Sequence, residues 1–184
     1  MKYLTQEDFR RIGIVASHCD LRKLEIAEME AFEFDLQSML CDYFFEVEEN
    51  WNNEDEEWEK ILNGTDWEGC NGKKRRHKGL RNLLAYIAYS RYVVIGQFDD
   101  TAGGISTKTA DFTIPKPLNA IKDYSNKYRS MANKVWEDVR SYLCFIGWNI
   151  DGCGGCKCGG GCKGNNNTRL FGARPNNVNK YGLQ

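Results

Sequence analysis

The stretch "KGLRNLLAYIAYSRYVVIGQ", residues 78–97, is the most apolar helical pattern in the chain. Its leucine and isoleucine side chains recur at helical spacing, and tyrosines cover much of the remaining surface. A helix that is apolar on most sides lies at the centre of a bundle or inside an interface. We therefore predict that this segment is the central helix of a small helical fold.

Long helical patterns flank this segment on both sides. Residues 21–47 carry an apolar stripe, with acidic residues on much of the other face, and Asp20 is a suitable N-cap. A final amphipathic helix is predicted over residues 118–143. Together these patterns predict a mainly α fold, a small bundle of about four to five helices.

Shorter segments complete the predicted fold. One helix begins after Thr5 and a second after Asn53, which is predicted to cap it, and Asn63-Gly64 ends the second. Residues 69–79 are predicted to form a basic loop or the entry to the central helix. Residues 105–114, after a Gly-Gly turn, predict a short hairpin or extended arm. These elements make one helical domain, residues 1–147, followed by an extended tail rich in Gly, Cys and Asn, residues 148–184.

The charge of the chain is strongly polarised, although the formal net charge is −1. Residues 1–70 contain 19 acidic and 6 basic residues, whereas residues 71–150 contain 6 acidic and 14 basic ones. Such a chain can attract a second copy of itself head to tail, and this contact closes into a ring if the rotation permits. The alternative is that the two halves neutralise each other within one subunit.

The densest basic run is "KKRRHK", with Lys73, Lys74, Arg75 and Arg76 as candidate interface residues. The run has no interleaved aromatic residues, so any contact with nucleic acid would be made to phosphates without reading sequence. An acidic protein surface, including the chain's own acidic half, is the other partner that suits it. His77 is predicted to be a solvated loop residue.

Four of the eight cysteines lie in the tail, in the sequence "GCGGCKCGGGC". Three interpretations stay open for this segment: a zinc site, disulfides formed after release, or a flexible leash with unpaired thiols. A structural zinc site usually pairs two well-separated knuckles, and here no long insert separates the cysteines, which are Cys153, Cys156, Cys158 and Cys162.

The sequence contains no pattern that predicts catalysis. It lacks a phosphate-binding glycine loop, a zinc-protease helix and a nucleophile elbow, and neither histidine has a credible catalytic partner. We therefore predict that the protein is not an enzyme, and we assign it no cofactor and no metal-binding residues. No apolar run is long enough to span a membrane, and the N-terminus lacks the apolar region of a secretion signal.

The ordered set of elements resembles the head–tail connector (head completion or adaptor) proteins of tailed phages. It is most similar to a neck ring protein of the crAss-like phages of Bacteroidales. The resemblance covers about residues 2–145. The stretches that carry it are "YLTQEDF" (3–9), "WEKILNGTDWEG" (58–69), "KGLRNLLAYIAYSRYV" (78–93) and "TAGGISTKTADFTIP" (101–115).

This resemblance implies a structural virion protein at the portal vertex, or neck, assembled in the host bacterial cytoplasm. The helical connector domain would form a ring, commonly twelvefold, beneath the portal protein and would dock the adjacent neck or tail protein. Genomic DNA would pass through the channel without sequence-specific contact. Such proteins carry no catalytic residues, and they often use arms and tails to hold neighbouring rings.

Residues 169–175 of the tail, "RLFGARP", are predicted to anchor the tail on a partner, the alternative being a disordered end. Leu170 and Phe171 would enter a groove, while Arg169 and Arg174 would pair with acidic residues. The alternative function is a small helical adaptor whose cysteine-rich tail binds zinc and contacts protein or nucleic acid.

Overall fold

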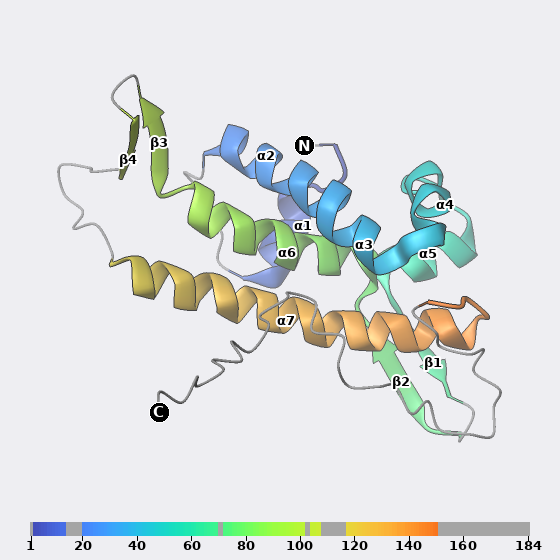
Figure 1. The fold of residues 1–184 in the computed structure, drawn as a ribbon. Helices are drawn as coiled ribbons and strands as arrows, with labels where there is room; N and C mark the ends of the chain where they lie inside the picture. Colours follow the sequence, from blue (N-terminus) through green and yellow to red (C-terminus); the bar gives the residue numbers. More distant parts are fainter. Residues whose placement is uncertain (1, 14–19, 70–71, 102–103, 108–116, 151–184) are drawn as a thin grey trace, which may run out of the picture.

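The computed structural model describes residues 2–13, 20–69, 72–101, 104–107 and 117–150, and it describes the side chains of these residues outside 99–107. The predicted mainly α fold is confirmed for these residues. Two short antiparallel hairpins accompany the helices (Figure 1). The predicted extended tail lies outside the described residues.

Helix α6 (Gly79–Ile95) is the central helix, as predicted. It packs between α2 (Leu21–Glu30) on one side and α7 (Leu118–Phe145) on the other, and α1 (Gln6–Ile12) and α5 (Glu56–Asn63) also contact it (Figure 1). Every residue from Leu83 to Ser90 is buried. The helix has no polar face in this stretch because neighbours cover it on several sides.

The helix predicted over residues 21–47 is present but irregular. After α2 it continues as a π-helical segment η1 (Ala31–Leu36), then α3 (Gln37–Leu40), a 3-10 turn η2 (Cys41–Tyr43) and α4 (Phe44–Glu49). Cys41 has a positive φ of 49°, which interrupts the regular helix. Of these segments α2, η1, α3 and α4 each bury apolar residues, whereas η2 buries none. Residues 21–49, here called the long run, therefore still bury one face.

Of the N-caps predicted for the two short helices, one is present and the other is not. Thr5 caps α1 in a capping box with Asp8, as predicted. The prediction for Asn53 was wrong, because α5 begins only at Glu56 and Asp55 is its N-cap. Asn53 instead accepts a hydrogen bond from the backbone N–H of Asp55, over 3.0 Å, in the turn before the helix.

Both hairpins differ from the predicted loops and arms. Residues 69–79 were predicted as a loop or helix entry, but they contain β2 (Lys74–His77), which pairs with β1 (Thr65–Glu68). The second hairpin starts earlier than predicted, since β3 (Phe98–Thr101) pairs with β4 (Gly104–Thr107). The remainder of the predicted arm, residues 108–114, lies outside the described residues.

An aromatic cluster ties the N-terminus to the long run. The rings of Tyr3 and Phe32 stack with centroids 3.6 Å apart, and Trp51 donates its indole N–H to the Tyr3 carbonyl over 2.7 Å. At the C-terminal end of the described chain, Trp148 stacks on Tyr43, and Ile150 is fully buried. The packed structure therefore continues to Ile150, just past the predicted domain boundary at residue 147.

Candidate intersubunit surfaces

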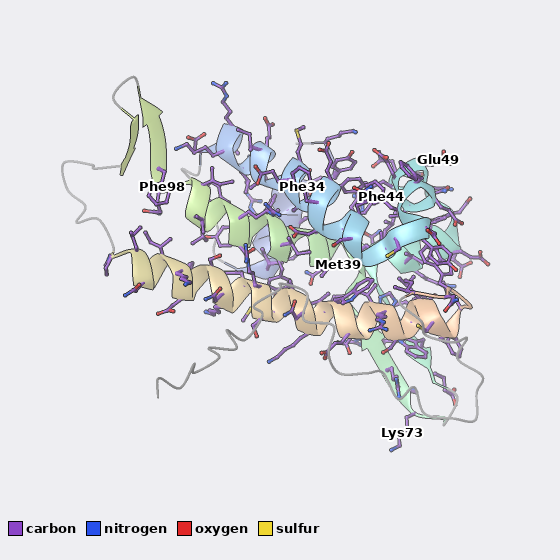
Figure 2. The ribbon with its side chains drawn as sticks, in the orientation of Figure 1. Phe34, Met39, Phe44, Glu49, Lys73 and Phe98 are labelled. Carbon is purple, nitrogen blue, oxygen red and sulfur yellow. The ribbon has the colours of Figure 1, made fainter. Side chains whose placement is uncertain are left out.

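The hairpin of β1 and β2, here called the basic ribbon, is fastened to α7 by aromatic contacts. The ring of Trp67 lies 4.8 Å from that of Phe145 and 5.8 Å from that of Tyr142. A two-stranded hairpin is marginal alone, so this aromatic contact fixes where the ribbon lies. From its base the ribbon projects past α7, with Lys73 at its far end (Figure 2).

His77 closes the base of the ribbon and is not the solvated residue that was predicted. Its side chain is 2% exposed and stacks on Tyr142, with ring centroids 4.2 Å apart. Neither ring nitrogen has a hydrogen-bond partner among the described residues. Burial lowers the pKa of His77 to about 4, so the imidazole is neutral at pH 7 and serves as a packing group.

A pair of glycines makes this arrangement possible. Gly64 ends α5 with φ of 90°, and Gly79 begins α6 with φ of 81°. A Cβ on Gly64 would lie 2.4 Å from the His77 carbonyl oxygen, and one on Gly79 would lie 2.3 Å from the Leu62 carbonyl oxygen. Only glycine permits this backbone approach, which sets the direction in which the ribbon leaves the bundle.

All four predicted basic residues lie on the ribbon or at its tip, and all are exposed. Two of them make contacts within the ribbon. Arg76 forms an ion pair with Asp66 on the opposite strand and lowers the pKa of that carboxyl group, and the guanidinium of Arg75 lies 5.5 Å from the centre of the Trp67 ring. Lys73 and Lys74 are exposed where the ribbon turns, and Lys74 also helps to lower the pKa of Asp66.

The acidic surface lies on the opposite side of the molecule (Figure 1). The solvent-facing side of the long run combines acidic and apolar side chains, and we call it the outer stripe. Few basic residues interrupt it. Its exposed members are Glu25, Ile26, Met29, Glu33, Phe34, Asp42, Phe45, Glu46 and Glu49.

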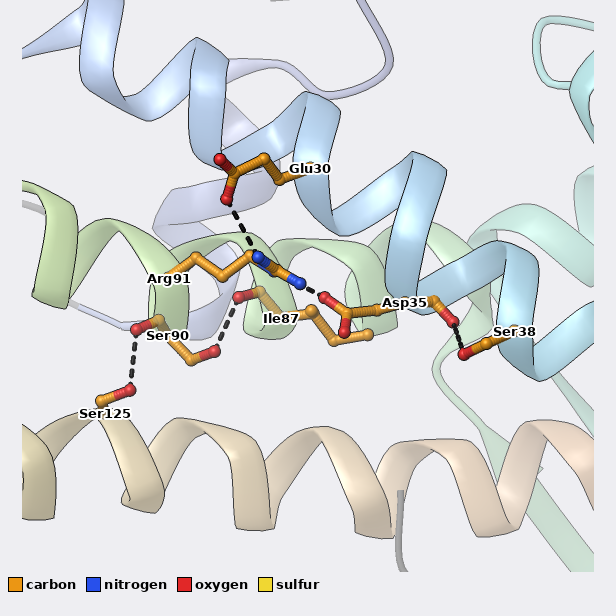
Figure 3. A network of polar contacts seen from close by, with 7 residues as sticks. All are labelled: Glu30, Asp35, Ser38, Ile87, Ser90, Arg91 and Ser125. Carbon is orange, nitrogen blue, oxygen red and sulfur yellow. Dashed lines mark hydrogen bonds and ion pairs between the residues drawn. The ribbon is translucent and has the colours of Figure 1, made fainter. Parts of the chain in front are cut away.

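Other carboxylates of the long run accept hydrogen bonds from groups inside the subunit. Arg91 of α6 donates to Glu30 over 2.9 Å and to Asp35 over 2.6 Å, which joins α6 to the long run (Figure 3). Glu28 is fully buried and accepts the backbone N–H groups of Tyr3 and Leu4, each over 2.6 Å. Burial raises the pKa of Glu28, against the effect of these donors. Part of the charge polarity is thus neutralised within one chain.

A pocket of about 310 Å³ lies at the base of the ribbon, beside α1 and the start of α6. Its lining carries both signs of charge, and its one histidine is the buried, neutral His77. We assign no chemistry to it. The charged residues that line it are Asp8, Arg11, Asp66, Arg76, Lys78 and Arg81.

The remaining predicted site residues lie outside the described part of the chain. They are the anchor residues Arg169, Leu170, Phe171 and Arg174, and the cysteines Cys153, Cys156, Cys158 and Cys162. Within the described ranges, no group of three or more His, Cys, Asp or Glu side chains is placed to hold a metal ion. No helix in those ranges has the length and hydropathy of a membrane span.

The comparisons with known proteins place the chain in a family without assigning it an activity. The model of a family of unknown function, DUF6712, matches residues 36–155. This match runs from the end of η1 through α7 and includes the basic ribbon and the central helix. No curated protein and no solved structure matches the chain. Because the family model spans more than half of its residues, the chain belongs to the family of unknown function DUF6712.

Proposed function

We propose that the protein is a structural virion component, a subunit of a head–tail connector ring beneath the portal of a tailed phage. The ring would extend the DNA channel and dock the next neck or tail protein. The role is passive and requires no catalytic residue or cofactor. DNA would pass through the channel without contacts to specific bases.

The observation that carries this proposal is the placement of the two charged surfaces. The basic ribbon projects past α7, and the outer stripe lies beyond α6 on the opposite side (Figure 1). A contact between one copy's ribbon and the next copy's stripe uses two different surfaces, so it is heterologous. Heterologous contacts generate rings when the rotation between subunits closes.

The geometry of the ribbon suits it for this contact. Trp67 and His77 of the ribbon pack on Tyr142 of α7. The tip is therefore held at a defined place relative to the bundle. A contact group that is already positioned loses less conformational freedom on binding. The charges at the tip would also speed encounter with an acidic surface, more strongly at low salt.

The test is reversal of Lys73 and Lys74 to Glu, because Arg75 and Arg76 also stabilise the ribbon itself. We expect this variant to stay folded. In native mass spectrometry it should form no ring, alone or with a cognate portal protein, under conditions in which the unchanged chain forms one. Asn126→Glu with Ser130→Glu, at exposed positions of α7, is the control. A ring from the reversed variant would refute the ribbon contact.

The same spectra test the assignment as a whole. A chain that forms no ring with the portal and carries one zinc ion would favour the alternative, a zinc-binding adaptor. Removal of residues 151–184 should give rings that form but do not hold their neighbour.

A further inference from the structure

The outer stripe exposes apolar side chains that the described part of the subunit does not cover. Phe34 is 64% exposed and Phe45 is 65% exposed, and the exposed Met29 and Ile26 stand about one and two helical turns before Phe34. Single exposed apolar residues are ordinary, whereas a row of them along one helical face indicates a binding surface. The stripe therefore requires an apolar occupant.

The charge of the stripe defines the occupant further. Exposed carboxylates stand next in sequence to the apolar positions, such as Glu33 beside Phe34 and Glu46 beside Phe45. An apolar segment would dock best if cations flanked its apolar residues, because each cation would meet a carboxylate at the rim. An acidic or purely apolar segment would leave these charges without a match.

The chain itself contains a segment of this composition. In residues 169–174, Leu170 and Phe171 form an apolar pair, and Arg169 and Arg174 flank them. Residues 151–184 contain one acidic and five basic residues, so the whole tail is attracted to the stripe. An apolar pair between arginines matches the alternation of phenylalanine and glutamate on the stripe.

The leash between the bundle and this segment reaches the stripe of the same chain. The described chain ends at Ile150, and the neighbouring Trp148 stacks on Tyr43, directly before α4. Residues 151–168 are rich in glycine, and a chain of this length can reach at most about 60 Å. The long run itself measures about 43 Å at the helical rise.

We infer that in the free subunit residues 169–174 dock on the outer stripe of their own chain. A leash of this length gives the segment an effective concentration on the order of 1 mM at its own stripe, which a second copy in dilute solution does not reach. The docked segment would cover the surface that the proposed ring contact uses. It would have to leave before a neighbour's ribbon could bind, and would then be available to hold another protein.

A photo-crosslink in the full chain tests this inference. The photo-reactive residue p-benzoylphenylalanine replaces Phe171, and the monomer is irradiated in reductant after mixing light and heavy nitrogen-labelled protein. We expect crosslinks to residues 26–46 that join peptides of the same label. Crosslinks that mainly join different labels would identify a second copy as the occupant and overturn the inference, as would links to other surfaces. A yield no higher than from position 181, where the same residue replaces Tyr181, would also overturn it.

Matched variants test the acceptor surface. Phe34→Ser with Phe45→Ser should lower the crosslink yield about tenfold, because aromatic anchors carry much of the energy of such contacts. Leu118→Ser with Tyr124→Ser, which removes two exposed apolar residues of α7, should leave it unchanged. Equal yields in the two variants would refute the stripe as acceptor. The measurement uses monomers, so it stands or fails independently of the ring.

Discussion

Phe32 and Phe34 lie two positions apart on the same helical run and meet opposite surroundings. Phe32 is fully buried, stacked on Tyr3 and edge-on to Trp51 with centroids 5.1 Å apart, whereas Phe34 is mostly exposed. Both belong to the long run, which therefore has two faces with different roles. The inner face holds the subunit together, and the outer face is available for association.

The largest contrast is expected between alanine substitutions at these two phenylalanines. Phe32→Ala should lower the free energy of unfolding by about 3–5 kcal/mol, since it empties a well-packed aromatic site. Phe34→Ala should lower it by no more than about 1 kcal/mol, because only the inferred docking of residues 169–174 covers this side chain. Chemical denaturation of both variants measures the difference. Similar losses at the two positions would show that Phe34 packs inside the bundle as Phe32 does.

The basic ribbon has the same contrast between the buried His77 and its exposed tip. The contribution of His77 can be measured from the pH dependence of the unfolding free energy. Unfolded His77 titrates near 6.5, but burial holds its folded pKa at about 4. Below pH 6.5 the unfolded state binds a proton that the folded state does not, so stability falls as the pH decreases towards 4. The full effect is on the order of 3 kcal/mol.

The measurement for His77 is the unfolding free energy from pH 7.5 to 4, compared with that of His77→Phe. The difference between the two proteins removes the contribution of other groups, including Glu28, whose pKa is raised and whose effect has the opposite sign. A pH dependence that is the same in both proteins would mean that His77 is protonated in the folded state.

Two arginine–carboxylate contacts should give a smaller contrast. Arg91 joins α6 to Glu30 and Asp35 in a partly buried setting, whereas the pair of Arg76 and Asp66 is fully solvated on the ribbon. Arg91→Met should cost about 2 kcal/mol, less than the loss of a fully buried partner. Arg76→Met should leave global unfolding nearly unchanged, because solvent screens exposed pairs. Thermal unfolding of both variants would decide this, and an equal loss would contradict the account.

The sequence predicted the features that depend on local pattern. The apolar run of residues 78–97 predicted the central helix, and Thr5 with Asp8 predicted a capped first helix. It also identified the basic run of Lys73, Lys74, Arg75 and Arg76, all of which are exposed, and their role at an interface stays a prediction. These features follow from neighbours in sequence, so no long-range contact had to be known.

The missed features depend on contacts between distant residues. Four consecutive basic residues show no apolar alternation, and β2 forms because β1 pairs with it and Tyr142 covers His77. The one available signal was the pair of glycines at Gly64 and Gly79, which brackets the ribbon. The division of the carboxylates into inner and outer sets could not be predicted, because it depends on where Arg91 lies.

The most direct measurement of the central claim, that the ribbon of one copy meets the outer stripe of the next, is a charge-reversal rescue followed by native mass spectrometry. Lys73→Glu with Lys74→Glu reverses the tip, and Glu33→Lys with Glu46→Lys reverses the stripe. Each pair alone should abolish ring formation, and a chain that carries all four substitutions should form rings again. Folded variants that fail to assemble even when combined, or a single reversal that assembles normally, would contradict the account.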